Sequence, residues 1–285
     1  MELAIILALG TMIFWGVGDF FIQKSARKIG NIEMLVFIGI IGSIIFLPFL
    51  IIQGNLITNW RIIIFLVALG ALAIVHALLI IKAFNIGKLS VIEVVAQIEL
   101  PVTIALSIIF LHEKLTSWQF LMILFVFSGV ILASMESWRD WKGNIEKGVV
   151  IAAISGLLMG ADNFLTGFAS KSITPIMALA LPWVAFMVVA LIIAWKNGEI
   201  KNVASHTKEY WPIILVATLG NVLGWICFVF AVEKNPISIV AAIAEGYVVV
   251  ALLLGITVNR EKIRWYQYIG AILALAGSIF LAMMI

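Results

Sequence analysis

Long apolar runs without charge recur along the chain and alternate with short polar segments. A transmembrane helix needs about 20 consecutive apolar residues, because each residue adds about 1.5 Å along the helix axis. Five runs reach this length with no ionisable residue inside them, and each predicts a membrane-spanning helix. They cover residues 34–53, 115–135, 172–195, 210–232 and 265–285.

Five further apolar runs contain at least one ionisable residue. They cover residues 3–23 with Asp19, 62–81 with His76, 89–111 with Glu93 and Glu99, 148–170 with Asp162, and 237–259 with Glu245. Ten spans with short connections use up a chain of 285 residues, so no room remains for a sizeable soluble domain. The predicted fold class is an all-α membrane protein with ten transmembrane helices.

Composition supports a membrane protein and excludes several kinds of site. Hydrophobic residues make up 64% of the chain and charged residues only 12%, which is far more apolar than a soluble domain with one core. Cys227 is the single cysteine and has no CxxC or histidine spacing, so neither a disulfide framework nor a zinc site is expected. The first apolar run has no basic segment before it, which predicts a retained helix. We expect no cofactor and no metal.

Basic residues predict the orientation, because Lys and Arg are retained on the cytoplasmic side of a membrane. In the ten-span arrangement, 14 of the 18 Lys and Arg residues fall in loops on one side. The other side receives only Arg61, Lys114, Lys171 and Lys234. Both termini are therefore predicted to lie outside a cell membrane that the chain crosses many times. The net charge of +3 follows from this asymmetry and from contacts with anionic lipid, with no need for a nucleic-acid partner.

The chain contains an internal repeat. "LHEKLTSWQ" at 111–119 matches "NREKIRWYQ" at 259–267 with an offset of 148, and the same offset places Gln97 on Glu245. In the first spans an offset of 144 places "GVGDFF" at 16–21 on "GADNFL" at 160–165, so that Asp19 corresponds to Asn163. We therefore predict a first five-helix repeat at 1–135, an interfacial linker at 136–147 and a second five-helix repeat at 148–285.

Each half holds five spans, and an odd number makes the second half enter the membrane in the opposite direction. Inverted repeats that meet near the bilayer midplane are how many secondary transporters achieve alternating access. The Glu–basic–aliphatic motif at Glu113 and again at Glu261, each leading into a Gly-containing last span, resembles the EamA-type branch of the drug/metabolite transporter superfamily. The resemblance implies ten helices around a shared cavity, with the third and fourth spans of each half at its wall. The family commonly has Gly before that Glu, where this chain has His112 and Arg260.

Carboxyl groups inside the spans are the main candidate functional groups. Asp at the centre of a spanning helix costs about 2.5 to 3.5 kcal/mol on insertion scales, so such side chains are expected to face protein or water. In this chain they occur only in the first, fourth, sixth and ninth spans, which the repeat makes two equivalent pairs. A cavity of this kind, with Lys82 as the basic exception, favours a cationic or amine-bearing solute. The predicted substrate-binding residues are Trp15, Asp19, His76, Gln97, Glu99, Asp162, Asn163, Asn221 and Trp225.

Glu93 and Glu245 are the predicted proton-coupling residues. Burial favours the neutral form of a carboxyl group, so such a residue can exchange a proton as the substrate comes and goes. Spacings of three and four residues place Glu93, Gln97 and Pro101 on one stripe of a continuous helix, with Glu99 about 120° away from Glu93. Gly16, Gly18, Pro101 and Gly160 are the positions at which close packing or bending is expected.

Structural roles compete with these functional ones. Asp19 is equally explained by pairing with Lys24 at the membrane edge, and Glu93 by the favourable field at a helix N-terminus. A lone His76 is more often a hydrogen-bonded packing residue, and Trp15 and Trp225 are more often packing residues than ligand platforms. Glu113 and Glu261 are predicted to be loop or cap residues at the membrane edge, and Glu113→Gln is predicted to be nearly silent.

A secondary transporter of small organic solutes, such as amino acids, amines or related metabolites, is the predicted function, as a proton-coupled exporter or a facilitator. The alternatives are a channel-like facilitator and an intramembrane lipid-acting enzyme. An enzyme would need a nucleophile with a base or a metal cluster, and no HExxH, GxSxG or CxxC motif occurs. A Walker A motif is also absent, which disfavours direct pumping by ATP. A monomer is sufficient, because the two repeats within one chain remove the need for a second copy.

Overall fold

The computed structural model describes residues 2–54, 59–86, 92, 95–135, 147–260 and 262–284, and within them the chain is helical with no β-strand. The predicted all-α fold class is confirmed. The helices are α1 (Glu2–Ile29), α2 (Asn31–Gln53), α3 (Trp60–Ile86), α5 (Glu99–Leu111), α6 (Ser117–Ser134), α7 (Lys147–Ser172), α8 (Met177–Lys196), α9 (Ile200–Lys234), α10 (Ile237–Ala244), α11 (Tyr247–Val258) and α12 (Trp265–Ala282).

Among the described residues, nine helical segments are long and apolar enough to cross a membrane. One of them joins α10 and α11 into a single segment, Ile237–Val258. The predicted fourth span at 89–111 is represented by the shorter α5, and much of its first half lies outside the described residues. Residues 136–146 of the predicted interfacial linker lie outside them too.

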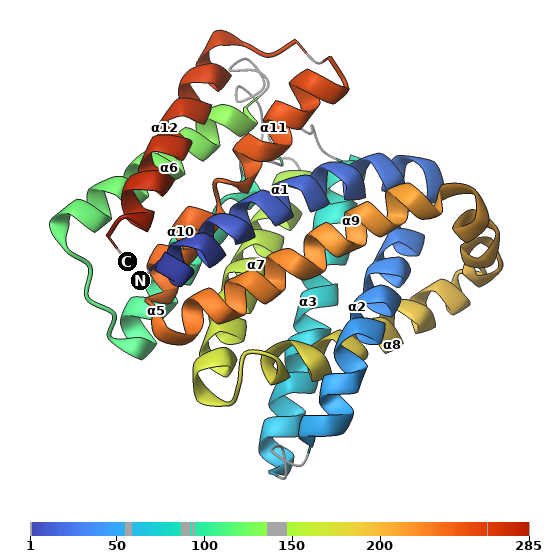
Figure 1. Ribbon diagram of the computed structural model, residues 1–285. Helices are drawn as coiled ribbons and strands as arrows, with labels where there is room; N and C mark the ends of the chain where they lie inside the picture. The colour runs from blue at the N-terminus through green and yellow to red at the C-terminus, as the bar shows by residue number, and fades with distance from the viewer. Residues whose placement is uncertain are drawn as a thin grey trace.

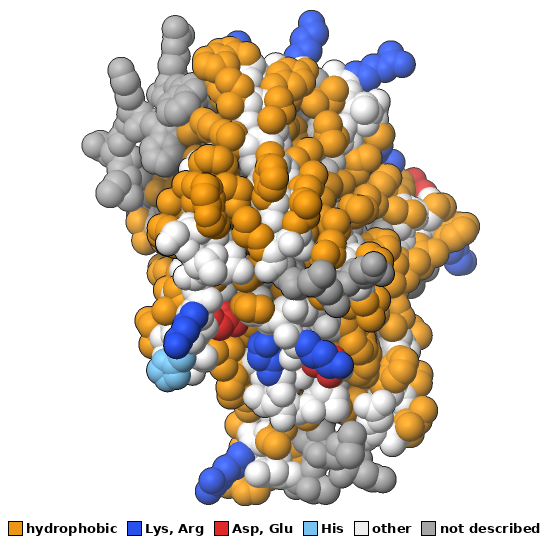
Figure 2. Space-filling view, turned by 60° about the vertical axis from the view of Figure 1, so that its left-hand side comes forward, with side chains coloured by type: hydrophobic (Ala, Val, Ile, Leu, Met, Phe, Trp, Pro, Cys, Tyr) orange, Lys and Arg blue, Asp and Glu red, His pale blue; other side chains and the backbone are white. Residues whose placement is uncertain are grey.

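The surface matches a chain surrounded by lipid. On the face in Figure 2, hydrophobic side chains cover most of the area, and Lys and Arg gather toward its upper and lower ends. Several tryptophans near the ends of the candidate spans are exposed, where amphipathic rings favour the membrane–water interface. They are Trp60, Trp118, Trp195, Trp211 and Trp265.

Contacts between helices relate one half of the chain to the other. When α1, α2, α3, α5 and α6 are exchanged with α7, α8, α9, α11 and α12, the main packing pairs map onto one another. The α1–α9 pair corresponds to α7–α3, the α1–α11 pair corresponds to α7–α5, and α2–α8 and α6–α12 map onto themselves. In Figure 1, α1 lies beside α9 and α6 lies beside α12. The sequence repeat is therefore also a repeat of packing.

The last helix of each half begins in the same way. The backbone N–H of Thr116 donates to Oε1 of Gln119 at 2.9 Å, and the backbone N–H of Arg264 donates to Oε1 of Gln267 at 2.8 Å. Glutamine at the third position of a helix satisfies an N–H group that the first turn leaves unpaired. The two pairs of capping residues are 148 residues apart, which is the offset of the sequence repeat.

His112 and Arg260 both adopt left-handed backbone conformations, with φ values of 53° and 56°. A side chain in that region costs about 1 to 2 kcal/mol relative to glycine. Glycine would therefore suit both positions better than His or Arg. We expect His112→Gly to raise the melting temperature of the purified protein in detergent by about 2 °C. Arg264→Gly is the control, because Arg264 has a φ of −84°; an equal or larger rise in that variant would contradict the backbone explanation.

Glu113 connects the two halves by hydrogen bonds, so we no longer expect Glu113→Gln to be nearly silent. Its Oε1 accepts a hydrogen bond from the backbone N–H of Ile237 at 2.6 Å. Its Oε2 accepts from the backbone N–H of Ser238 at 3.0 Å and from the Ser238 hydroxyl at 2.5 Å. The residue is a cap, as predicted, but it caps α10, a helix of the other half.

We expect Glu113→Gln to lower the free energy of unfolding by about 2 kcal/mol, because an amide has one acceptor oxygen and directs N–H groups toward other donors. Thermal denaturation in detergent measures this. Glu233→Gln is the matched control, because Glu233 is exposed at the end of α9. Equal melting temperatures for Glu113→Gln and the control would show that the cap contributes nothing.

Candidate functional site

Helices that cross at glycine residues, with no side chain between them, bring the candidate site together. At Gly18 of α1, a Cβ atom would lie 2.7 Å from the backbone nitrogen of Asn221, and at Gly220 of α9 it would lie 2.7 Å from the Cα of Gly18. Only glycine permits this approach. Asp19 and Asn221, the residues that follow these two glycines, both line the cavity described below.

A second pair of close approaches follows the repeat. A Cβ atom at Gly16 would lie 2.7 Å from the carbonyl oxygen of Tyr247 and 2.4 Å from the Cβ of Val250. At Gly160 it would lie 2.5 Å from the carbonyl oxygen of Glu99 and 2.7 Å from the Cβ of Val102. The two glycines are 144 residues apart and their partners 148 apart. The close packing expected at Gly16, Gly18 and Gly160 is therefore present, whereas Pro101 is exposed.

Both fourth spans are interrupted at matching positions. Residues 97–98 form a turn before α5, and Glu245 and Gly246 form a turn between α10 and α11. Continuous helices were predicted here. Gln97 is buried whereas Pro101 is exposed, so the predicted stripe through Gln97 and Pro101 is wrong. Discontinuous membrane helices of this kind line binding sites in many transporters.

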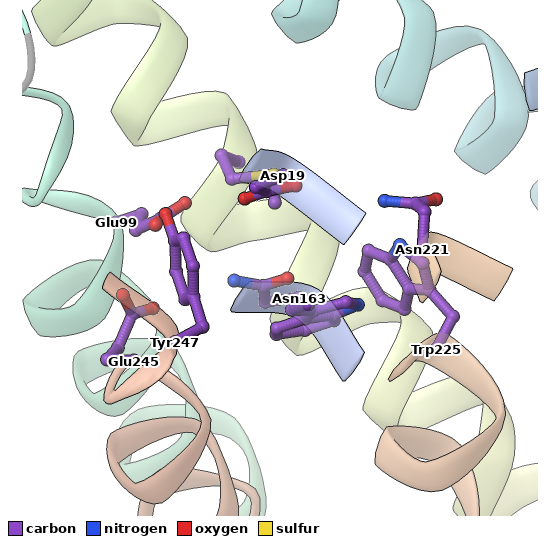
Figure 3. Close-up of a pocket in the computed structure, with 9 residues that line it drawn as sticks. Asp19, Glu99, Asn163, Asn221, Trp225, Glu245 and Tyr247 are labelled. Carbon is purple, nitrogen blue, oxygen red and sulfur yellow. The ribbon is translucent and has the colours of Figure 1, made fainter. Parts of the chain in front are cut away.

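A cavity of about 50 Å³ lies where these elements meet, and we call it the acidic chamber. Its wall consists of Trp15, Asp19, Glu99, Met159, Asn163, Asn221, Trp225, Glu245 and Tyr247. Three pairs in this list are related by the repeat, namely Trp15 with Met159, Asp19 with Asn163, and Glu99 with Tyr247. Figure 3 shows the carboxyl groups of Asp19 and Glu99, the Asn163 amide and the Tyr247 ring around one space. The volume is enough for a few water molecules.

Three carboxyl groups share this chamber, and the described part of its wall contains no Lys or Arg. The side chains of Glu245 and Glu99 are within hydrogen-bonding reach, and Asp19 is near enough to act on Glu245 electrostatically. Glu245 is 2% exposed and Glu99 6%. Lys82, the basic residue expected near the cavity, is exposed and lines neither cavity described here.

Aromatic rings form one side of the acidic chamber. The ring centroids of Trp15 and Trp225 are 5.0 Å apart, and those of Trp15 and Tyr247 are 6.3 Å apart, with their planes nearly perpendicular in the second pair. Faces of Trp and Tyr attract cations within about 6 Å. Carboxyl groups and aromatic faces around one small space are together suited to an ammonium group.

Several buried polar atoms at the chamber have no hydrogen-bond partner within the described protein. They are Nε1 of Trp15, Oδ1 of Asn163 and Oε2 of Glu245. Buried polar groups are ordinarily paired, and leaving one unpaired costs about 1 to 3 kcal/mol. Two of these three atoms are acceptors, so the chamber favours a ligand that donates hydrogen bonds.

A second cavity of about 150 Å³ adjoins the first, and we call it the apolar chamber. The two cavities share Met159, Asn221 and Trp225. The rest of its wall comes from α2, α3, α7 and α8 and is mainly hydrophobic: Leu35, Ile38, Leu69, Ala73, His76, Ala77, Asp162, Thr166, Ala178, Leu179, Pro182, Trp183 and Phe186. Nε2 of His76 lies 3.6 Å from Oδ2 of Asp162 at its polar part.

Most of the predicted substrate-binding residues lie at one of the two chambers. Gln97 is buried but lines neither chamber. Glu93 lies outside the described residues, and its role stays a prediction. Sequence reasoning missed Met159 and Tyr247; their positions relative to Trp15 and Glu99 in the repeat could have identified them. It also missed the apolar wall from α2 and α8, whose sequences contain no charge in the predicted spans.

Comparison with known proteins agrees with this architecture. The model of the EamA-like transporter family matches residues 2–135 and again residues 146–283. An uncharacterised protein of Methanocaldococcus jannaschii, MJ1333.1, is 34% identical over 138 residues, which is 48% of this chain and all of that protein. A solved structure titled "Crystal structure of protein" matches with a TM-score of 0.76 over 99% of this chain and 96% of its own, at 10% identity. This last likeness concerns the fold alone.

Proposed function

The chain belongs to the EamA-like transporter family, and from that premise we propose that it is a secondary transporter that exports small amine-bearing solutes by alternating access. It is a multi-pass membrane protein. The observation that carries the proposal is the acidic chamber, where Asp19, Glu99 and Glu245 meet away from any Lys or Arg of the described wall. Such a site attracts positive charge and donors of hydrogen bonds.

An inverted arrangement of the two halves supports alternating access. Each family-model match corresponds to five predicted spans, and an odd number of crossings reverses the second half. The paired contacts at Gly16 and Gly160 are those expected if equivalent helices pack equivalently around one axis. A relative whose entire length corresponds to about half of this chain also fits an origin by duplication. The protein can then alternate between two related packings, each of which opens the chamber to a different side of the membrane.

Proton exchange in this proposal takes place at Glu245, with Glu99 as its neighbour. Two carboxyl groups within hydrogen-bonding reach are stable when one of them carries a proton, because two adjacent negative charges repel. An ammonium group entering beside them replaces the proton, and its departure allows the proton to return. Solute and proton thus compete for one chamber, which is the requirement for exchange between them.

Orientation and assembly form part of the same proposal. Both termini lie outside the cell in this proposal, as the loop charges predict. The repeat allows the chain to act as a monomer, with solute and lipid as its partners. A reporter fused to the C-terminus would lie outside the cell under this arrangement and in the cytoplasm under the reverse one.

Purified protein in liposomes tests the proposed function. When a pH gradient is imposed, we expect saturable uptake of radiolabelled propylamine above that of protein-free liposomes, and loss of this excess when a proton ionophore collapses the gradient. Propionate, which has similar size and opposite charge, is the control and should not be taken up. Flux of propylamine that rises linearly with concentration would support a channel instead, and equal uptake of both solutes would contradict a site selective for cations.

A further inference from the structure

We infer that the acidic and apolar chambers are two parts of one solute site, which takes an amine that carries a single ring-sized apolar group. The inference rests on the proposed function and gives it a substrate class. The ammonium group lies in the acidic chamber and the apolar group in the apolar chamber.

The chambers share one wall. Met159 of α7 and Asn221 and Trp225 of α9 line both of them, so only these side chains separate the two spaces. A methionine side chain changes rotamer readily and adapts to neighbouring groups. A solute that spans the wall at Met159 can therefore contact both chambers at once.

The volume of the apolar chamber sets the size of the group that it holds. A cavity of about 150 Å³ lined by aliphatic and aromatic side chains is large enough for a benzene molecule, and the apolar chamber has this volume. The wall is made of groups such as Leu69, Trp183 and Phe186. The acidic chamber, at about 50 Å³, is too small for a ring but large enough for an ammonium group.

Charge assigns the ammonium group to one chamber. In the apolar chamber the single carboxyl group is that of Asp162, whose Oδ2 has His76 as its neighbour at 3.6 Å and whose Oδ1 has no partner among the described residues. In the acidic chamber three carboxyl groups meet beside the faces of Trp15 and Trp225, and Oε2 of Glu245 is unpaired. An ammonium group is therefore stabilised more strongly in the acidic chamber. The apolar group gains by leaving water for the chamber lined by hydrocarbon.

Binding of three ligands to the wild-type protein in detergent tests the inference by isothermal titration. We expect 2-phenylethylamine to bind at least about tenfold more tightly than propylamine, because a buried ring removes more apolar surface from water. We expect 2-phenylethanol, which has the same ring and no ammonium group, to bind much more weakly than 2-phenylethylamine. Equal affinity for the two amines would overturn the ring subsite, while leaving the proposed amine transporter intact. Absence of binding by either amine would overturn both.

Ala73→Leu locates the ring. Ala73 lines the apolar chamber, and the larger side chain fills part of it, so we expect the ratio of the propylamine Kd to the 2-phenylethylamine Kd to fall to about one. Ala71→Leu is the matched control, because Ala71 lies two residues away on α3 and lines neither chamber. A preference that survives Ala73→Leu, or is lost equally in Ala71→Leu, would place the ring elsewhere. The wild-type comparison stands even where a variant is unstable.

Discussion

Glu245→Gln is expected to abolish propylamine uptake driven by a pH gradient, with a loss of at least about 100-fold in initial rate. The substitution keeps the size of the side chain and removes the carboxyl group that, in the proposed mechanism, gives up its proton when the solute binds. Glu245 is 2% exposed and lies at the turn between α10 and α11, within reach of Glu99. The amide has no charge to attract an ammonium group, so solute binding weakens together with coupling.

Uptake into liposomes, together with the amount of protein inserted, measures this effect. Glu233→Gln is the control, because it removes an exposed carboxyl group at the end of α9, away from both chambers. We expect the control to transport at the wild-type rate. Glu245→Gln protein that inserts normally and still transports at the wild-type rate would remove Glu245 from the mechanism.

Gly18→Val is expected to have the second largest effect, on stability as well as on transport. A Cβ atom at this position would lie 2.7 Å from the backbone nitrogen of Asn221, so α1 and α9 would have to separate. Forcing apart a packed helix crossing costs about 3 kcal/mol or more. The separation would also displace Asp19 and Asn221, which both line the acidic chamber.

Thermal denaturation in detergent and the yield of monodisperse protein measure this loss. Gly54→Val is the matched control, because a Cβ atom at Gly54 would have no atom within 4 Å. We expect Gly54→Val to melt as the wild type does, and Gly18→Val to melt at a much lower temperature or to fail to accumulate. Equal melting temperatures for the two variants would contradict a tight crossing at Gly18.

The sequence allowed most of the fold to be predicted because its strongest signals are physical requirements of a membrane. Apolar length determines where helices cross, and an ionisable residue in such a run needs a protein or water environment. Asp19, Glu99 and Glu245 were identified in this way, and they line one chamber. The repeat was visible because helix caps and close crossings need particular residues, such as Gln119 and Gly160.

Interruptions within helices were not predictable from apolar periodicity. The spacing argument for Gln97 assumed a continuous helix, and the turn at 97–98 invalidates that assumption. The turn at Glu245 and Gly246 has a visible signal only in retrospect, since glycine weakens a helix. The role of Glu113 was missed because its partners, Ile237 and Ser238, are more than 120 residues away in the chain.

The apolar chamber was missed for a different reason. Its walls on α2 and α8 consist of hydrophobic residues, among them Leu35 and Trp183. Such residues look the same in sequence whether they face lipid, another helix or a cavity. Only the packing of five helices around the cavity distinguishes a chamber wall from a surface in contact with lipid.

Sidedness of labelling at corresponding helix ends tests most directly the central claim, that two inverted halves enclose the acidic chamber. In a Cys227→Ser background, single cysteines replace Arg27 at the end of α1 and Ser172 at the end of α7, both of which are exposed. A membrane-impermeant thiol reagent is then applied from each side of intact vesicles. We predict labelling of Arg27→Cys from one side only and of Ser172→Cys from the other side only. Labelling of both from the same side would show that the halves run in the same direction and would contradict the proposed mechanism.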